Sequence, residues 1–192
     1  MLLDSEKIQE IESLSRDILS SIYSDSENIV PPINIERILE NNDVKLRIGD
    51  FSDPEVSGYY ERSTQSISVS QDDPYPRQIF TIAHELGHHF LHDTKKDVFH
   101  RKDAINIASE ERQEETEANW FAASLLMPAF LVKRTWMLKQ SIKYIAEFFE
   151  VSNITAFYRL KNLGLLAAQE EQNQIKVLKK FGFMKYKSVL SN

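Results

Sequence analysis

The sequence contains no cysteine. This absence excludes a disulfide-stapled scaffold, a zinc site with thiolate ligands and a cysteine nucleophile. A metal site in this chain must therefore use histidine, aspartate or glutamate. Long hydrophobic runs are missing as well, because the longest apolar stretches, such as Phe121 to Leu126, fall far short of the roughly twenty residues that a membrane-spanning helix needs.

A surplus of basic residues is also lacking, since 23 Lys and Arg stand against 29 Asp and Glu, for a net charge of -6. Phosphate-driven affinity needs such a surplus, so broad nucleic-acid binding is disfavoured. The tail 175–192 is an exception with five lysines and no acid, which we interpret as a solvated terminal helix. Charge begins at Asp4, with no basic segment before an apolar run, so the sequence predicts no secretory signal and a cytoplasmic protein.

The spacing of apolar residues predicts an α+β protein. Spacings of three and four residues predict long helices over 4–23, 76–92 and 109–127, a short helix over 33–42, and further short helices up to Gly164. Alternation predicts three short strands, in an antiparallel or mixed sheet, over 44–48, 58–60 and 66–70. The charged stretch 94–108 is expected to be a mobile connection. We expect residues 1–140 to form the main domain and 141–192 a helical C-terminal region with the basic tail.

The helix expected over 76–92 contains the motif H-E-x-x-H, formed by His84, Glu85 and His88. Residues four apart lie on one face of a helix, about 6 Å apart along its axis, so the two imidazoles can bind one metal ion. Glu85 is displaced around the helix and can approach a water molecule at the metal without occupying a ligand position. This spacing predicts a zinc hydrolase site.

Catalytic zinc usually takes three protein ligands, so a third ligand is required. His92 lies about 12 Å along the helix from His84, too far to share the ion, and is either an orienting residue or a satisfied helix-end histidine. The metzincin extension is excluded because its third histidine position is occupied by Thr94. His89 points away from the predicted metal face and is expected to pack or face solvent.

The remaining source is a carboxylate on the next helix, whose first half carries Glu110, Glu111, Glu114, Glu115 and Glu117. Most of these must form a solvated face. Glu115 stands out because Asn119 follows on the same face, where its amide can orient a ligating histidine by a hydrogen bond. Glu117 is the rival third ligand. Small residues at Ala118 and Ala122 predict a close approach of the two helices.

These motifs together resemble the ImmA/IrrE family of zinc metallo-endopeptidases. The likeness covers roughly residues 30 to 166 and rests on five segments: Ser57 to Tyr60, Phe80 to His92, Glu115 to Pro128, Ile145 to Ser152 and Arg159 to Gly164. Two metal-ligand motifs at compatible spacing are far more specific than one.

The resemblance implies a zincin-like α+β fold in which a small three-stranded sheet packs on the metal-binding helix. It implies that His84, His88 and Glu115 bind Zn²⁺ and that Glu85 is the general base for hydrolysis of a peptide bond. Family members cleave or inactivate helix-turn-helix repressors of mobile elements or stress responses. A repressor of this kind is therefore the expected partner and substrate. We further expect the strand over 65–70 to accept an extended substrate at its edge.

Two alternatives remain open from the sequence. Residues 141–163 resemble a helix-turn-helix, which allows a DNA-binding module, although Arg159 and Lys161 are the only cations of its second segment. We expect these two cations to recognise an acidic partner surface instead. The second alternative is a regulator that keeps the metal site and acts by protein contact without proteolysis.

Overall fold

The computed structural model describes residues 3–23, 29–53, 56–92, 98–100 and 109–180 of the 192-residue chain. The elements in these ranges, in chain order, are α1 (Ser5–Ile22), α2 (Ile35–Asn41), β1 (Lys45–Gly49), β2 (Gly58–Glu61), β3 (Ser66–Ser70), α3 (Tyr75–Leu91), β4 (Val98–His100), α4 (Ser109–Leu126), α5 (Ala129–Leu138), α6 (Ile142–Phe149), α7 (Asn153–Asn162) and α8 (Ala168–Lys180). The predicted α+β class is confirmed.

The sheet is mixed and has the strand order β1-β3-β2-β4. Strand β1 runs parallel to β3, whereas β2 is antiparallel to both β3 and β4. All three predicted strands form. An additional strand, β4, lies within the connection expected over 94–108. The sequence did not predict it, because a three-residue strand is too short to produce a recognisable alternation. The rest of that connection lies outside the described residues.

Strand β3 occupies an interior position of the sheet, with β1 on one side and β2 on the other. Its backbone hydrogen-bonding groups are therefore used within the sheet, and all five of its residues are buried. The prediction that this strand offers an edge to an extended substrate is wrong. The alternating pattern of Ser66 to Ser70 identified a strand but carried no information about its neighbours.

Several helices begin at residues whose side chains cap them. The Asp4 carboxylate accepts a hydrogen bond of 2.7 Å from the backbone nitrogen of Lys7 at the start of α1. Ser141 and Ser152 cap α6 and α7 in the same way. Helix α3 instead begins after Pro74 with a second proline in its first turn, where a missing N–H costs no helical hydrogen bond.

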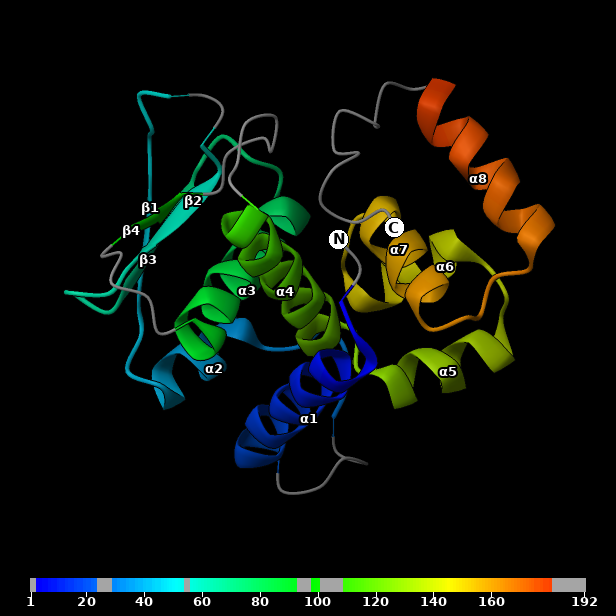
Figure 1. Ribbon diagram of the computed structural model, residues 1–192, viewed down its shortest axis with the longest axis horizontal. Helices are drawn as coiled ribbons and strands as arrows, with labels where there is room; N and C mark the ends of the chain where they lie inside the picture. The colour runs from blue at the N-terminus through cyan, green and yellow to red at the C-terminus, as the bar shows by residue number, and fades with distance from the viewer. Residues whose placement is uncertain (1–2, 24–28, 54–55, 93–97, 101–108, 181–192) are drawn as a thin grey trace.

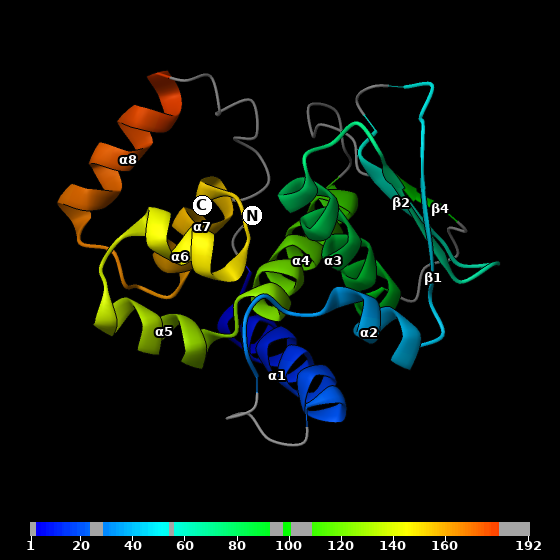
Figure 2. The same cartoon turned by 180° about the vertical axis from the view of Figure 1, so that it is seen from behind.

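Helices α3 and α4 lie side by side at the centre of the molecule (Figures 1 and 2). The sheet covers α3 on one side, α1 packs against α4, and α5 to α8 lie on the far side from the sheet. The α3–α4 contact depends on Gly87, because a Cβ atom at this position would lie only 2.9 Å from the Ala118 Cα atom. The close approach expected from small residues on α4 is therefore matched by a glycine on α3.

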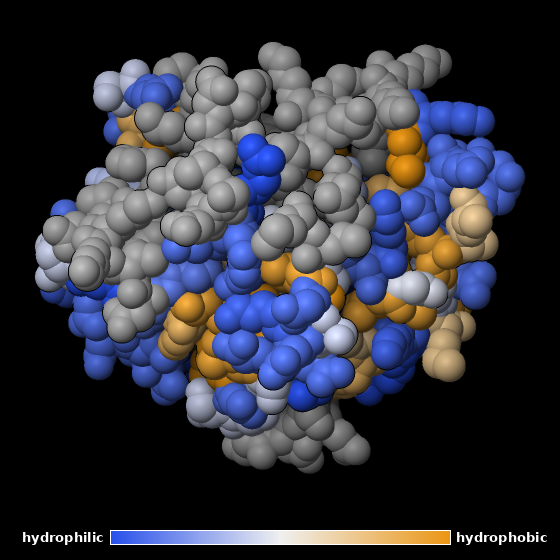
Figure 3. Space-filling view, in the orientation of Figure 1, coloured by the Kyte–Doolittle hydropathy of each residue, from blue (hydrophilic) through white to orange (hydrophobic). Residues whose placement is uncertain are grey.

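One apolar core extends through these layers and includes Ile67 from β3, Leu86 from α3 and Phe121 from α4, all of them fully buried. Hydrophilic residues cover most of the described part of the face in Figure 3, with separate apolar areas between them. Within the described ranges no single helix has both the length and the apolar character to cross a membrane. Among the described helices, α4 from Arg112 and α5 reach that length and apolar character together, but the two are bent by 58° to each other.

Candidate metal centre

Helix α3 brings two histidine side chains to the same buried place. His84 and His88 are 0% and 1% exposed, and their Nε2 atoms lie 3.1 Å apart. The four-residue spacing produces this convergence, as the H-E-x-x-H motif predicted. The other ring nitrogen of His84, Nδ1, lies 3.2 Å from Oδ1 of Asn119.

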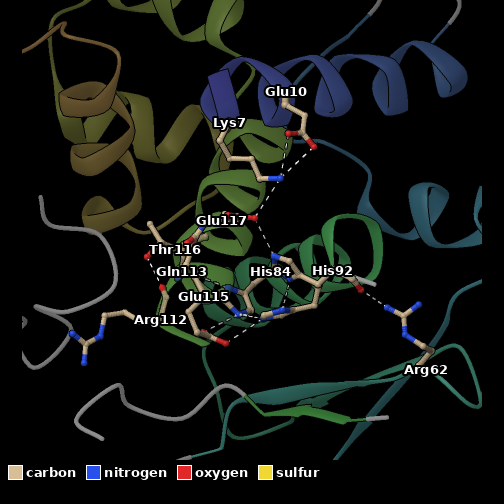
Figure 4. Close-up of polar contacts among 12 residues, drawn as sticks. Lys7, Glu10, Arg62, His84, His92, Arg112, Gln113, Glu115, Thr116 and Glu117 are labelled. Carbon is tan, nitrogen blue, oxygen red and sulfur yellow. Dashed lines mark hydrogen bonds and ion pairs between the residues drawn. The ribbon is translucent and has the colours of Figure 1, made fainter. Parts of the chain in front are cut away.

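Helix α4 supplies the facing carboxylate. The Oε1 atom of Glu115 lies 3.2 Å from Nε2 of His88, and its Oε2 atom lies 3.4 Å from Nε2 of His84 (Figure 4). Ligand atoms of these three residues all lie within 4.8 Å of one another, so the cluster can hold a metal ion. Among the described residues, no other group of histidines and acids has this geometry.

Asn119 connects the two helices at this point. Its side-chain nitrogen donates a 2.6 Å hydrogen bond to the backbone oxygen of Glu115, which leaves its Oδ1 atom to accept from Nδ1 of His84. This arrangement directs the Nε2 lone pair of His84 toward Glu115 and His88. The structure therefore contains the hydrogen bond that the predicted orienting role of Asn119 requires.

The protonation states of the cluster suit metal binding. Burial lowers the pKa of His88 to about 4, an effect that the nearby Glu115 opposes and His84 reinforces. Burial acts to raise the pKa of Glu115, but His84 and His88 outweigh it and hold this pKa well below its ordinary value of 4.5. At neutral pH His88 is thus neutral and Glu115 ionised, which are the forms that coordinate a metal.

The remaining candidate residues are not members of this cluster. Glu85 follows His84 on α3, and its side chain is completely buried. Glu117, the rival third ligand, is directed to a different group: its Oε2 atom lies 3.2 Å from Nε2 of His92 and its Oε1 atom accepts a 2.9 Å hydrogen bond from Gln113. His89 lies 2.7 Å from the Tyr60 hydroxyl through its Nδ1 atom, in a packing position.

The two cations of α7 do not form an exposed pair. Arg159 is 1% exposed, its side chain bonds both oxygens of Glu12 in α1, and its Nε atom donates to the backbone oxygen of Met127. Lys161 forms an ion pair of 2.9 Å with Glu171. The expectation that Arg159 reads a partner surface is wrong, because its side chain is buried and paired with Glu12.

Helix α7 also lacks the exposed face that a DNA-reading helix requires. Six consecutive residues, Thr155 to Leu160, are buried. The preceding turn passes through Glu150, which adopts the left-handed backbone conformation with φ 52° and ψ 41°. A helix that reads bases must present side chains to a groove, so the geometry weighs against this segment as a DNA-reading module.

Residues missed by the sequence reasoning belong to α1. The Nζ atom of Lys7 lies 3.6 Å from Oε2 of Glu117, so the first helix reaches the group beside the metal cluster. The Glu12 carboxylate likewise accepts hydrogen bonds from Trp120 and Ser124 of α4. No local pattern could have revealed these contacts, because an exposed charge and a buried one look alike on an amphipathic helix.

Comparison with known proteins agrees with this geometry. The model of the IrrE N-terminal-like domain, the Peptidase_M78 family, matches residues 39–161. The chain belongs to this family, and the resemblance found in its motifs is confirmed. Family membership supports a metallopeptidase-type function for the site that α3 and α4 form.

A solved structure has a similar fold. A Mycobacterium tuberculosis transcriptional regulator is 17% identical and superposes with a TM-score of 0.58, covering 82% of this chain. The present chain spans 47% of that protein's length, and at this identity the likeness concerns the fold alone. No curated protein matches the chain.

Proposed function

We propose that the protein is a zinc-dependent endopeptidase in which His84, His88 and Glu115 hold the metal and Glu85 is the general base. The observation that carries this proposal is the convergence of two buried imidazole nitrogens and one carboxylate on a single point. Two histidines and one carboxylate are the ligand set of a catalytic zinc site, which keeps a further position for water or substrate. A structural zinc site would need a fourth protein ligand.

The chemistry divides between the metal and the chain. When bound, zinc acts as a Lewis acid that polarises a peptide carbonyl and makes nearby water more acidic. Glu85 accepts the proton of the attacking water and delivers it to the leaving amine nitrogen. Its fixed position beside His84 on α3 and its complete burial support this role.

The substrate we propose is a helix-turn-helix transcriptional repressor of a mobile element or stress regulon, cleaved in the cytoplasm. Support comes from the family to which the chain belongs and, weakly, from the M. tuberculosis protein of similar fold, which is a transcriptional regulator. The second candidate is a regulator that keeps the metal site without proteolysis. The likeness to a transcriptional regulator favours this candidate to the same extent.

The test is co-incubation of the zinc-loaded protein with a candidate repressor, followed by mass spectrometry of the products. We expect the parent protein to cut the repressor at a defined peptide bond and Glu85→Gln to leave it intact, since an amide cannot accept the proton. Glu114→Gln, which removes a charge from α4 outside the ligand cluster, is the matched control and should cleave normally.

The outcomes separate the two candidates. Cleavage by Glu85→Gln at the parental rate would contradict the proposed role of Glu85. Tight binding of the repressor without cleavage by the zinc-loaded parent would favour the regulator. Equal metal content in the parent and Glu85→Gln is the control that makes either result interpretable.

A further inference from the structure

The second ring nitrogen of His88 is held by another histidine. Nδ1 of His88 lies 3.0 Å from Nδ1 of His92, and both rings are buried. His92 terminates α3, one helical turn beyond His88. The contact therefore places an imidazole directly behind the proposed metal ligand, on the side opposite to His84 and Glu115.

His92 is held in turn by a carboxylate from α4. Nε2 of His92 lies 3.2 Å from Oε2 of Glu117 (Figure 4). Glu117 is fixed by the hydrogen bond from Gln113 and by the ion pair with Lys7. The result is a continuous chain of contacts from α1 through α4 to the metal cluster, Lys7–Glu117–His92–His88.

The chemistry of these groups sets the direction of the hydrogen bonds. An ionised carboxylate only accepts, so Nε2 of His92 must donate to Glu117. The 3.0 Å contact between the two Nδ1 atoms needs one donor and one acceptor, so Nδ1 of His92 accepts from Nδ1–H of His88 when Nε2 of His88 is the metal-binding atom. His88 is thereby held in the tautomer whose Nε2 lone pair points at the metal cluster. The reverse direction would put a hydrogen on the nitrogen that must bind the metal.

We propose that His92 and Glu117 are positioning residues that select the metal-binding tautomer and ring orientation of His88, with Lys7 of α1 anchoring Glu117. The proposal rests on the proposed metal site and assigns Glu117 a different task from that of Glu115. Asn119 contacts His84 directly in the same way, whereas His88 is oriented through two consecutive contacts, with His92 and then Glu117. Lys7 lies outside the segment that the family model matches.

The first test measures the affinity for Zn²⁺ and Co²⁺ by competition with a chelator. Glu117→Ala should bind either metal about 10- to 100-fold more weakly than the parent, the usual cost of removing a group that orients a metal ligand. Glu10→Gln is the matched control, because Glu10 also contacts Lys7 but is exposed and does not touch His92. It should bind like the parent. Lys7→Met should have a smaller effect than Glu117→Ala, because Lys7 is partly exposed.

The second test observes the direction of the hydrogen bond to Glu117 in the metal-free protein. Nitrogen NMR of the imidazole rings at neutral pH should find His92 in a single Nε2–H form in the parent and in Glu10→Gln. Glu117→Ala should convert this signal to a mixture of the two tautomers. Glu117→Gln, which keeps the side-chain volume, is measured beside it and should also weaken the preference, since an amide can donate as well as accept.

Parental affinity and a parental His92 tautomer in both Glu117 variants would overturn the proposal. So would an Nδ1–H form of His92 in the parent protein. Failure of the parent to bind either metal would instead refute the proposed function, and the tautomer measurement, which needs no metal, would still decide the role of Glu117.

Discussion

Helix α4 takes part in two buried polar networks that differ in how their donors and acceptors balance. In one, the Glu12 carboxylate accepts hydrogen bonds from the guanidinium of Arg159, the indole of Trp120 and the hydroxyl of Ser124. In the other, two imidazole nitrogens and the Glu115 carboxylate converge as electron-pair donors. The first network ties α1 to α4 and α7 through pairs formed within the chain, whereas we propose that a metal ion balances the second.

The comparison shows that burial of charge alone does not mark a functional site. Arg159 is as deeply buried as His88, yet its charge is neutralised by Glu12 within the chain. What distinguishes the cluster of His84, His88 and Glu115 is that its electron-pair donors all point at one place. Each network should therefore respond to a different perturbation.

The largest effect is expected from removal of the metal. A ligand present at about a thousand times its dissociation constant stabilises the folded state by about 4 kcal/mol. Chelation should therefore lower the unfolding temperature of the zinc-loaded protein by on the order of 10 °C. Calorimetry with and without a chelator measures this, and an unchanged unfolding temperature would show that the cluster binds no metal tightly.

The second largest effect is expected from breaking the ion pair between Glu12 and Arg159. Arg159→Met leaves a partly buried carboxylate without its cation, so the free energy of unfolding should fall by about 3 kcal/mol. The matched control Lys161→Met removes a partly exposed pair and should cost less than about 1 kcal/mol. Denaturant titration measures both variants. A metal affinity that fell together with stability in Arg159→Met would contradict the independence of the two networks.

A smaller loss is expected where α3 and α4 touch. Gly87→Ala places a methyl group against the backbone of Ala118, which should cost about 2 kcal/mol and separate the helices that carry the ligands. The control Gly49→Ala meets no atom within 4 Å and should change stability little. If Gly87→Ala kept the parental metal affinity, the site would tolerate a wider helix spacing than we infer.

The smallest effect is expected from acid, which should weaken the network around Glu12 and lower the free energy of unfolding. Burial acts to raise the pKa of Glu12, but Arg159, Ser124 and Trp120 together hold it below the ordinary value of 4.5. A lowered folded-state pKa gives stability that is present above about pH 4.5 and is lost as pH falls through the folded-state pKa. Stability of Glu12→Gln should therefore decline less steeply in this range than that of the parent. Parallel pH profiles of the metal-free proteins would contradict the assignment.

The sequence indicated that His84, His88 and Glu115 lie close together, because this geometry is local to two helices. His84 and His88 share a face by helical spacing, and Glu115 and Asn119 share a face on α4 for the same reason. Only the pairing of the two helices was needed in addition. Which of Glu115 and Glu117 faces His84 depended on their contact, which the sequence left open.

The misjudged residues all depend on partners distant in the chain. Arg159 lies 147 residues from Glu12, and the exposed role assigned to it failed because no pattern near α7 indicates an acid from α1. The place of β3 inside the sheet depends on the parallel pairing with β1, which alternation cannot reveal. Sequence periodicity predicted faces, and the tertiary fold determined their neighbours.

The most direct test of the proposed metal site is an anomalous-difference map from crystals grown with zinc. We predict one strong peak within about 2.0–2.2 Å of Nε2 of His84, Nε2 of His88 and a carboxylate oxygen of Glu115, with Glu117 on His92 and not on the metal. A peak coordinated by Glu117, or no peak between α3 and α4, would contradict this assignment.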